Sequence, residues 1–352
     1  MQKFRAFLER KDIRPSWRLY FIDAMGSMAM GLFASLLIGT IFNTVYTYFG
    51  GEIFKDLATA ATAVTGAALG VAIANALHAP TLVLLCAAAV GYAGNGFGDT
   101  FLIDGVEKTV TAGPAGAFVA VIIAVELGKM VSKETKIDIL VTPIVTILSG
   151  VVAAKLLCPI VAYGMYWIGW FINTVTPLQP ILMGVLIAVT VGIALTLPIS
   201  SAAICAMIGI SGLAGGAATA GCCAQMVGFA VMSFRENRVG GLVAQGLGTS
   251  MLQMGNIVKN PKIWIAPTLT SAITGPLATT VLSIQNVGVS AGMGTCGLVG
   301  PLGALMYAPN GVGDIWKIVL VCIIIPAILS LVFGEILRKI GWIRENDLKL
   351  DV

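Results

Sequence analysis

The chain has 352 residues, of which 57% are hydrophobic and 11% are charged, and its formal net charge is +4. A soluble domain normally carries about 25% charged residues, so this chain has too few polar groups to cover a soluble core of its size. The composition excludes an ordinary soluble enzyme. It predicts an integral membrane protein with no nucleic-acid partner.

Both ends of the chain are basic. Residues 1–16 mix apolar with basic side chains and predict a short amphipathic helix on the cytoplasmic face of the membrane. Lysines and arginines precede the first apolar run and follow the last one: Lys3, Arg5, Arg10, Lys11, Arg14 and Arg18, then Arg338, Lys339, Arg344 and Lys349. By the positive-inside rule both ends are cytoplasmic, which requires an even number of crossings. We therefore expect this helix at 1–16, one membrane domain at 17–340 and a cytoplasmic tail at 341–352.

Long intervals without charged residues lie between these ends. A helix needs about 20 apolar residues to cross the hydrocarbon core, so the intervals hold about ten transmembrane helices. The apolar runs are 19–44, 57–77, 80–96, 112–131, 138–157, 159–177, 180–197, 218–234, 240–258, 263–284 and 315–338. This is one range more than an even count permits, so at least one of them is not a separate crossing. The sequence predicts an all-α polytopic membrane protein.

Charges between the apolar runs support the orientation. The acidic segment 97–111 is predicted to be extracytoplasmic, whereas the lysines within 129–136 and the basic turn 235–238 are predicted to be cytoplasmic. Glu126 lies three residues before Lys129 near the end of a span. We interpret the two as an ion pair that reaches toward the membrane interface.

Two apolar stretches, 198–217 and 285–312, are too rich in glycine and proline to be simple helices. Irregular backbone at membrane depth is tolerated only where protein or a water-filled cavity covers it, so we expect two re-entrant, hairpin-like segments that line a solute site. Both contain the pattern G-x-x-G-L-x-G, which starts at Gly209 and at Gly294. Alternatively these glycines only allow close helix packing, as we expect for Gly66 and Gly70.

Neutral polar side chains cluster beside both stretches and include Thr249, Ser250, Gln285 and Ser290. Such groups suit a ligand that is polar and uncharged, such as a sugar. The residues predicted to bind the solute are Ser200, Ser201, Gln225, Glu236, Asn237, Gln245, Gln253, Asn256, Asn286, Gly292, Gly294 and Thr295. For any single Gln or Asn, an interhelical hydrogen bond is the alternative role, and for Glu236 it is a solvated turn.

No cofactor or metal is expected. The seven cysteines lie mostly within apolar runs and are interpreted as packing residues, because the adjacent Cys222 and Cys223 lack a second ligand pair. The glycines from Gly292 to Gly297 match a dinucleotide fingerprint only formally, since no soluble βαβ unit surrounds them. We find no catalytic centre in the sequence, neither a Walker loop nor a nucleophile–base pair.

Several motifs together resemble a known family. They lie at 197–203, 221–230, 233–237, 244–253, 271–278 and 291–300. These stretches are similar to the EIIC-like membrane proteins of the sugar phosphotransferase system, in the branch that includes the perfringolysin O regulators. The resemblance covers the whole membrane domain.

The resemblance implies a multi-pass carrier in the bacterial inner membrane, a homodimer of about ten spans in which a solute-binding half moves against a dimerising half. It also implies a cytoplasmic IIB-type phosphotransferase partner and a sugar site with a His and a Glu. Here Glu236 is the counterpart of that acid, whereas the only histidine, His78, lies in the other half of the sequence. With no IIA or IIB domain expected in this chain, phosphotransfer would require the separate partner.

Together these patterns predict a membrane transporter of a small polar solute, sugar-like in chemistry, that works by alternating access. The alternative is a membrane regulator that senses the solute without transporting it. A third possibility is an enzyme that phosphorylates the solute with a IIB-type donor.

Overall fold

The computed structural model describes residues 7–13, 16–103 and 106–350. The chain divides into two compact units: unit 1 contains Met1–Gly39 and Thr59–Gly164, and unit 2 contains Thr40–Ala58 and Met165–Val352. Half of the predicted helix at 1–16 lies outside the described residues, as do the last two residues of the predicted tail. The described part of that helix is helical over 7–10.

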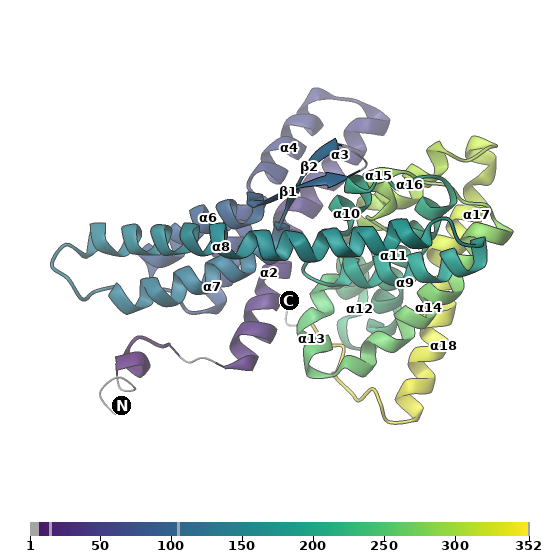
Figure 1. Cartoon of the computed structure of the whole chain (residues 1–352). Coiled ribbons are helices and arrows are strands. Elements are labelled where there is room, and N and C mark those ends of the chain that lie inside the picture. The colour runs from purple at the N-terminus through teal and green to yellow at the C-terminus, as the bar shows by residue number, and fades with distance from the viewer. Residues whose placement is uncertain (1–6, 14–15, 104–105, 351–352) are drawn as a thin grey trace. The chain divides into compact units, whose positions relative to one another are not determined.

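The first half of the chain is almost entirely helical (Figure 1). Its elements are the π-helical Leu19–Ala24 and Phe33–Leu37, α2 (Met25–Leu32), α3 (Ile38–Phe49), α4 (Glu52–Ala63), α5 (Thr65–Ala76), α6 (Thr81–Gly96), β1 (Gly98–Ile103), β2 (Val106–Thr111), α7 (Gly113–Val131) and α8 (Asp138–Val175). Strands β1 and β2 form an antiparallel hairpin in the predicted acidic loop, with Gly98 opposite Thr111. The all-α prediction therefore holds apart from this hairpin.

Glycines set the packing of α5 against α6 in unit 1. A Cβ at Gly70 would lie 2.0 Å from the carbonyl oxygen of Ala87, and one at Gly66 would lie 2.7 Å from the Cα of Tyr92. Such contacts are possible only where the side chain is a hydrogen atom. The predicted packing role of Gly66 and Gly70 is confirmed.

Charged groups tie the start of the chain to the loop after α7. Arg10 lies 2.7 Å from Glu134, and Lys11 lies 2.5 Å from the same carboxylate. The hydrogen bond from Lys11 holds the pKa of Glu134 below its usual range. The start of the chain and this loop therefore lie on one side of unit 1, as the orientation rule predicts.

The Glu126–Lys129 pair is present, with 3.8 Å between Lys129 Nζ and a Glu126 oxygen. Lys129 is only 1% exposed, and its ammonium group donates to the backbone carbonyl of Asp12 at 3.1 Å. The start of the chain therefore covers Lys129, and the location of the pair at the membrane interface stays a prediction.

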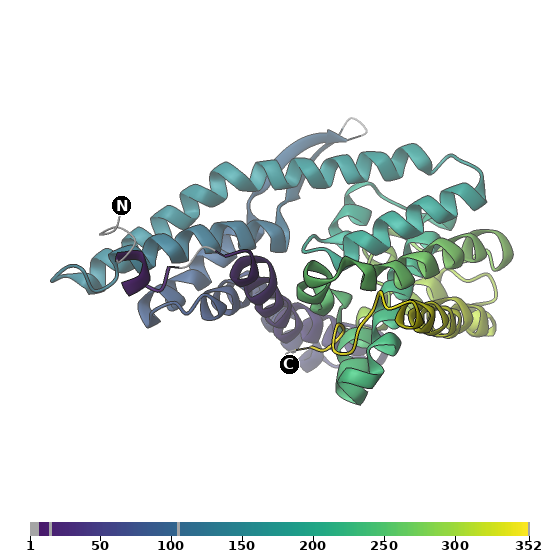
Figure 2. The same cartoon turned by 90° about the horizontal axis from the view of Figure 1, so that it is seen from below.

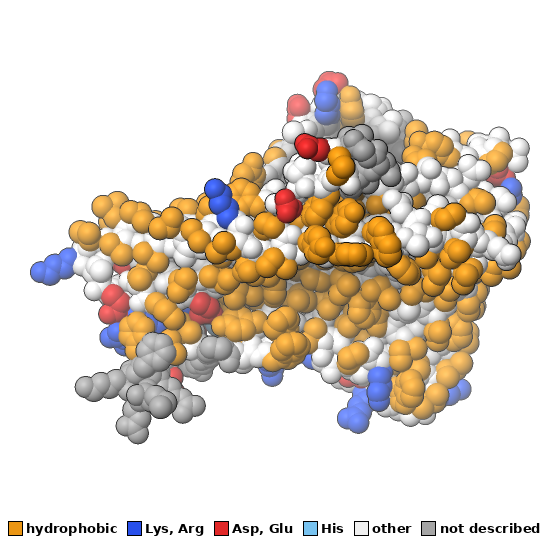
Figure 3. Space-filling view, in the orientation of Figure 1, with side chains coloured by type: hydrophobic (Ala, Val, Ile, Leu, Met, Phe, Trp, Pro, Cys, Tyr) orange, Lys and Arg blue, Asp and Glu red, His pale blue; other side chains and the backbone are white. Residues whose placement is uncertain are grey.

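Helix α8 replaces two predicted spans. The ranges 138–157 and 159–177 are a single helix of 38 residues that contains Pro143 and Pro159 in its interior. Exposed apolar side chains recur along α8 every three or four residues: Leu140, Ile144, Leu148, Val152, Leu156, Ile160, Tyr163, Trp167 and Trp170. A band of hydrophobic side chains follows its course in Figure 3. This row has the chemistry of a lipid-facing surface.

The second half of the chain is also helical but is interrupted more often. Its elements are α9 (Pro180–Thr196), α10 (Ser201–Met207), α11 (Gly212–Met232), α12 (Phe234–Val243), the π-helical Ala244–Gly248, the 3₁₀ turn Ser250–Gln253, α13 (Met254–Lys259), the 3₁₀ turn Pro261–Trp264, α14 (Ile265–Pro276), the π-helical Leu277–Val281, α15 (Gly288–Ala291), the 3₁₀ turn Cys296–Leu298, α16 (Val299–Met306), the 3₁₀ turn Gly311–Asp314, α17 (Ile315–Val319), the π-helical Leu320–Ile324 and α18 (Ile325–Lys339). The predicted span 240–258 is broken, since it contains parts of four helical pieces: α12, the π-helical Ala244–Gly248, the 3₁₀ turn Ser250–Gln253 and α13.

Helix α11 is the centre of unit 2. Every residue from Ala214 to Ala230 is buried, whereas only 28% of the most apolar window of the helical run Gly311–Lys339 is buried. Lipid is as apolar as leucine, so hydrophobicity does not separate the inside of a membrane protein from its outside. Small and polar residues lie inside instead.

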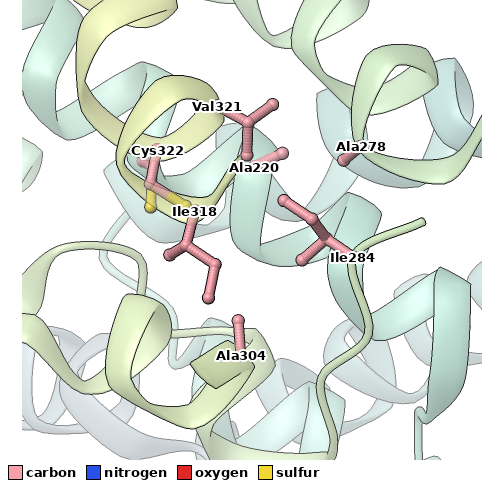
Figure 4. Packing of buried hydrophobic residues seen from close by; sticks show 8 residues of the cluster. Ala220, Ala278, Ile284, Ala304, Ile318, Val321 and Cys322 are labelled. Carbon is pink, nitrogen blue, oxygen red and sulfur yellow. The ribbon is translucent and has the colours of Figure 1, made fainter. Parts of the chain in front are cut away.

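A cluster of buried apolar residues joins α11 to the second irregular stretch and to the last long helix (Figure 4). The cluster consists of Ala220, Cys223, Ala278, Ile284, Ala304, Ile318, Val321 and Cys322. Ala304, within the irregular stretch 285–312, and Ile284, at its edge, both point into the cluster. This contact holds non-helical chain against a buried helix.

Five helices among the described residues are long and apolar enough to cross a membrane, and a sixth span results if α4 and α5, bent by 47°, count as one. Helices α6 and α9 are apolar but shorter. These observations agree with a multi-pass α-helical membrane protein. The predicted number of about ten crossings stays a prediction.

The glycine contacts of α11 give a test of this packing. A Cβ at Gly221 would lie 2.0 Å from the carbonyl oxygen of Ala188 in α9. We expect Gly221→Ala to lower the free energy of unfolding by about 1–3 kcal/mol, because the backbones must separate. Unfolding in mixed detergent–SDS micelles measures this. The control Gly164→Ala in α8, where no atom lies within 4 Å of the new methyl group, should not be destabilised. An equal loss in both variants would contradict the packing.

Candidate functional site

The two irregular stretches of unit 2 lie directly against each other. Ser201 Oγ at the start of α10 donates to the carbonyl oxygen of Gly292 at 2.7 Å. A Cβ at Gly292 would lie 2.6 Å from the carbonyl oxygen of Ser201. Ser200 accepts a hydrogen bond from the backbone N–H of Ala203 and so caps α10. Segments about 90 residues apart in sequence thus form one assembly.

The two copies of the pattern G-x-x-G-L-x-G share left-handed glycines, although the leucine of the second copy, Leu298, is also left-handed (φ +62°) and that of the first is not. The first two glycines of each copy are left-handed: Gly209 and Gly212 both have φ +63°, and Gly294 and Gly297 have φ +55° and +53°. Only glycine adopts this conformation at little cost. The third glycine of each copy lies inside the helix that follows, in α11 and in α16. At both places the pattern therefore leads from irregular chain into a helix.

Asn286 connects the second stretch to α11 and is completely buried. Its amide nitrogen donates to Thr219 Oγ1 at 2.8 Å and to the carbonyl oxygen of Gly300 at 3.1 Å. Its oxygen accepts from the N–H of Val287 at 2.9 Å and from Ser290 Oγ at 2.6 Å. These short bonds use the hydrogen-bonding capacity of the side chain, so Asn286 holds the irregular backbone in place.

Gly294 and Thr295 also contact α11. A Cβ at Gly294 would lie 2.8 Å from Cys222, and Thr295 Oγ1 lies 3.6 Å from Met226 Sδ. The second irregular stretch therefore follows α11 over successive turns, and Gln225 lies on the same part of that helix.

Gln225 is the centre of a buried polar group that we call the Gln225 cluster: Thr196, Gln225, Ser250, Trp264 and Thr268. Gln225 Oε1 accepts from Trp264 Nε1 at 3.0 Å and from Thr196 Oγ1 at 3.4 Å, and its amide nitrogen donates to Thr268 Oγ1 at 3.3 Å. The hydroxyls of Thr196 and Ser250 are 2.8 Å apart. Four separate segments of the chain thus meet at one neutral polar centre.

The Gln225 cluster lies where two helices break. Thr196 is the last residue of α9 and precedes Leu197, whose backbone is extended. Ser250 begins a 3₁₀ turn after Thr249, whose backbone is extended too. Gln225 and Ser250 are fully buried, whereas Trp264 and Thr268 are half-buried. Trp264 and Thr268 therefore form the more exposed side of the cluster.

Sequence reasoning named Gln225 and noted Ser250 but missed Thr196, Trp264 and Thr268. Those three residues lie within or at the end of ordinary apolar runs. The available signal was the four-residue spacing of Trp264 and Thr268, which places both on one face of a helix.

The other predicted amides lie in a different place. Asn237, Gln253 and Asn256 donate to backbone carbonyls of residues 348 and 349 at 2.7–2.9 Å. Gln245 donates to Ser233 Oγ at 2.7 Å and accepts from Gln253 at 2.9 Å. The structure therefore separates the predicted site into three parts: the Gln225 cluster, the paired irregular stretches, and a group of amides beside residues 348 and 349.

Glu236 is held in an ion pair. One oxygen lies 2.7 Å from Arg338, whose guanidinium also donates to the carbonyl oxygen of Met232 at 3.1 Å. The side chain of Glu236 is 4% exposed, and its second oxygen has no hydrogen-bond partner among the described residues. This carboxylate is not the solvated turn considered as its alternative.

Two cavities of about 350 and 410 Å³ lie in unit 1. Charged groups line them, including Asp12, Lys129 and Glu134, and both include His78. None of the predicted solute-binding residues lines either cavity. Within the described residues, no group of three or more His, Cys, Asp or Glu side chains could hold a metal ion.

Comparison with known proteins gives one match. The family model described as "Phosphotransferase system, EIIC" matches residues 22–350, nearly the whole chain. No curated protein and no solved structure matches the chain. The match extends over both irregular stretches and the Gln225 cluster, and the chain belongs to the EIIC family of the phosphotransferase system.

Proposed function

We propose that the protein carries a small, uncharged, sugar-like solute across the bacterial inner membrane by alternating access, and that the Gln225 cluster binds this solute. The observation that carries the proposal is the meeting of neutral polar side chains at two helix breaks beside a fully buried helix. Broken helices that surround a polar site are typical of secondary transporters.

The lengths of the hydrogen bonds favour this site over the others. The bonds between Gln225 and Thr196 or Thr268 are 3.4 and 3.3 Å long and the one from Trp264 is 3.0 Å, whereas those of Asn286 are between 2.6 and 3.1 Å. Bonds near 3.4 Å are weak, so little is lost when a solute hydroxyl replaces them. A sugar hydroxyl both donates and accepts, which matches an amide beside hydroxyl groups.

The paired irregular stretches are the proposed moving part. They contact α11 through hydrogen bonds and glycine contacts, and they enter their helices through left-handed glycines. We propose that they act as re-entrant segments and that the solute-binding part moves against a dimerising part in a homodimer. We propose one membrane domain at 17–340, with about ten crossings, for this arrangement.

Both ends of the chain are proposed to be cytoplasmic. The ion pairs of Arg10 and Lys11 with Glu134, and that of Arg338 with Glu236, each place an end of the chain beside a loop predicted to be cytoplasmic. A cytoplasmic IIB-type protein is the proposed partner if transport is coupled to phosphorylation.

Solute binding can be tested without knowing the solute. Purified protein is heated with a panel of pentoses, hexoses, sugar alcohols and sugar phosphates, and a ligand raises the melting temperature. We expect Gln225→Leu to weaken the binding of any stabilising compound by about 10- to 100-fold, because buried hydrogen bonds to the solute are lost. Each variant is compared with its own ligand-free melting temperature.

The matched control is Gln179→Leu. Gln179 is exposed before α9 and makes no side-chain cap. Its replacement should leave the ligand response unchanged. The site assignment is wrong if Gln225→Leu responds as strongly as the wild type, and the sugar-like class is wrong if no compound stabilises the wild type.

Transport itself needs a second measurement. Reconstituted liposomes loaded with the best-binding compound should exchange it for labelled compound outside, and Gln225→Leu should slow this counterflow at least tenfold at solute concentrations below Kd. Binding without counterflow would contradict transport and favour the sensing regulator.

A further inference from the structure

We propose that the amide row, defined as Asn237, Gln253, Asn256 and Asn260, is a binding site for a peptide backbone and that residues 342–350 of the same chain occupy it as a latch on the turn that carries Ser250. Figures 1 and 2 show this segment running back from α18 toward α13. The peptide site is independent of the proposed function, and only the effect of the latch on solute binding depends on it.

The amide row recognises main-chain atoms. Asn237 and Gln253 donate to the carbonyl oxygen of Leu348 at 2.7 and 2.9 Å, and Asn256 donates to that of Lys349 at 2.8 Å. The N–H of Leu350 donates back to Asn237 Oδ1 at 2.8 Å. Both polar groups of one side chain are thus paired with a peptide, as in a strand ladder.

Asn260 extends the row to the start of the segment. It donates to the carbonyl oxygen of Trp342 at 2.9 Å and to Asp347 Oδ2 at 2.7 Å. The same Asp347 oxygen accepts from the N–H of Arg344 at 2.8 Å and so fixes a turn within the segment. The row therefore holds a folded peptide at both of its ends.

Two apolar side chains anchor the segment. Leu348 is 0% exposed and Ile343 is 3% exposed, whereas the residues 344–346 between them are exposed. Burial of such apolar side chains away from water stabilises the bound segment. This alternation of buried anchors and exposed polar residues is typical of a peptide bound at a surface.

Gln253 and Asn256 each donate to one partner outside the segment and to one within it. Gln253 donates to Gln245 Oε1 at 2.9 Å as well as to Leu348, and Asn256 donates to Gln253 Oε1 at 2.8 Å as well as to Lys349. Gln253 is 0% exposed and Asn256 is 7% exposed, so departure of the segment would leave one buried N–H of each without its partner. Because an unpaired buried donor is unfavourable, the row favours an occupied state.

One short turn links the amide row to the Gln225 cluster. Ser250 and Gln253 are the first and last residues of a single 3₁₀ turn. Ser250 pairs with Thr196 at 2.8 Å, and Gln253 holds Leu348. Release of the segment therefore loosens the turn that closes the Gln225 cluster on one side.

The test uses the full chain with a specific protease site inserted between Ile340 and Gly341, where the chain is exposed. After cleavage in detergent, we expect the 341–352 fragment to elute with the membrane body in size-exclusion chromatography. A 100-fold excess of synthetic 341–352 peptide should exchange with it, as isotope labelling and mass spectrometry show.

The variant Gln253→Leu with Asn256→Leu should reduce the retained fragment at least tenfold. The control Asn43→Leu, at an exposed position of unit 2, should retain it as the wild type does. The peptide site is overturned if the wild-type fragment dissociates on cleavage. It is overturned equally if the double variant keeps the fragment while its melting temperature stays that of the wild type.

Hydrogen exchange tests the link without any solute. Backbone amides of 250–256 should exchange at least tenfold faster in cleaved protein from which prolonged dialysis has removed the fragment that chromatography retains, while those of α9 stay protected. Unchanged hydrogen exchange at 250–256 would contradict the proposed latch. Because this readout involves no solute, it cannot fail merely because the Gln225 cluster binds something else.

Discussion

The close approach of backbones to α11 is the constraint on which unit 2 depends. Cβ atoms at Gly215 and Gly216 would lie 2.0 and 1.9 Å from the carbonyl oxygens of Asn286 and Ile284. These contacts bring non-helical chain against a buried helix in an environment where no water can satisfy it. Gly221 does the same for α9. Because the backbones touch, polar side chains between them are few, and each needs a partner within the protein.

This requirement gives different roles to side chains that look equal in the sequence. Asn286 has four short hydrogen bonds, two of them to backbone groups, whereas two of the three hydrogen bonds of Gln225 are longer and all three join it to other side chains. A group that already has ideal partners gains nothing from a ligand. A group whose hydrogen bonds are long and weak is stabilised when a ligand supplies better ones. Bond geometry therefore separates structural amides from a candidate binding amide, and residue type alone does not.

The class of protein, the irregular stretches and their glycines could be predicted, since charge-free runs and glycine density are local properties of the sequence. The boundaries of α8 could not be predicted, because a proline such as Pro159 usually marks the end of a helix, yet this helix continues through it.

The candidate site could be predicted only in part. Asn237, Gln253 and Asn256 were chosen as neutral hydrogen-bonding groups, which they are, but the sequence gives no sign that residues 348–350 return to them. Such long-range contacts depend on how α18 ends, which no local pattern encodes.

The chemistry of the amide row explains why a sugar site and a peptide site are hard to distinguish. A carboxamide offers two N–H donors and one carbonyl acceptor, and both a sugar hydroxyl and a peptide group pair with it. What distinguishes the two ligands is the surrounding surface: a peptide brings apolar side chains such as Leu348, which need a dry contact, whereas a sugar needs polar groups on several sides. The amide row has the first environment and the Gln225 cluster has the second. The Ser250–Gln253 turn belongs to both, and the proposed latch acts through these four residues.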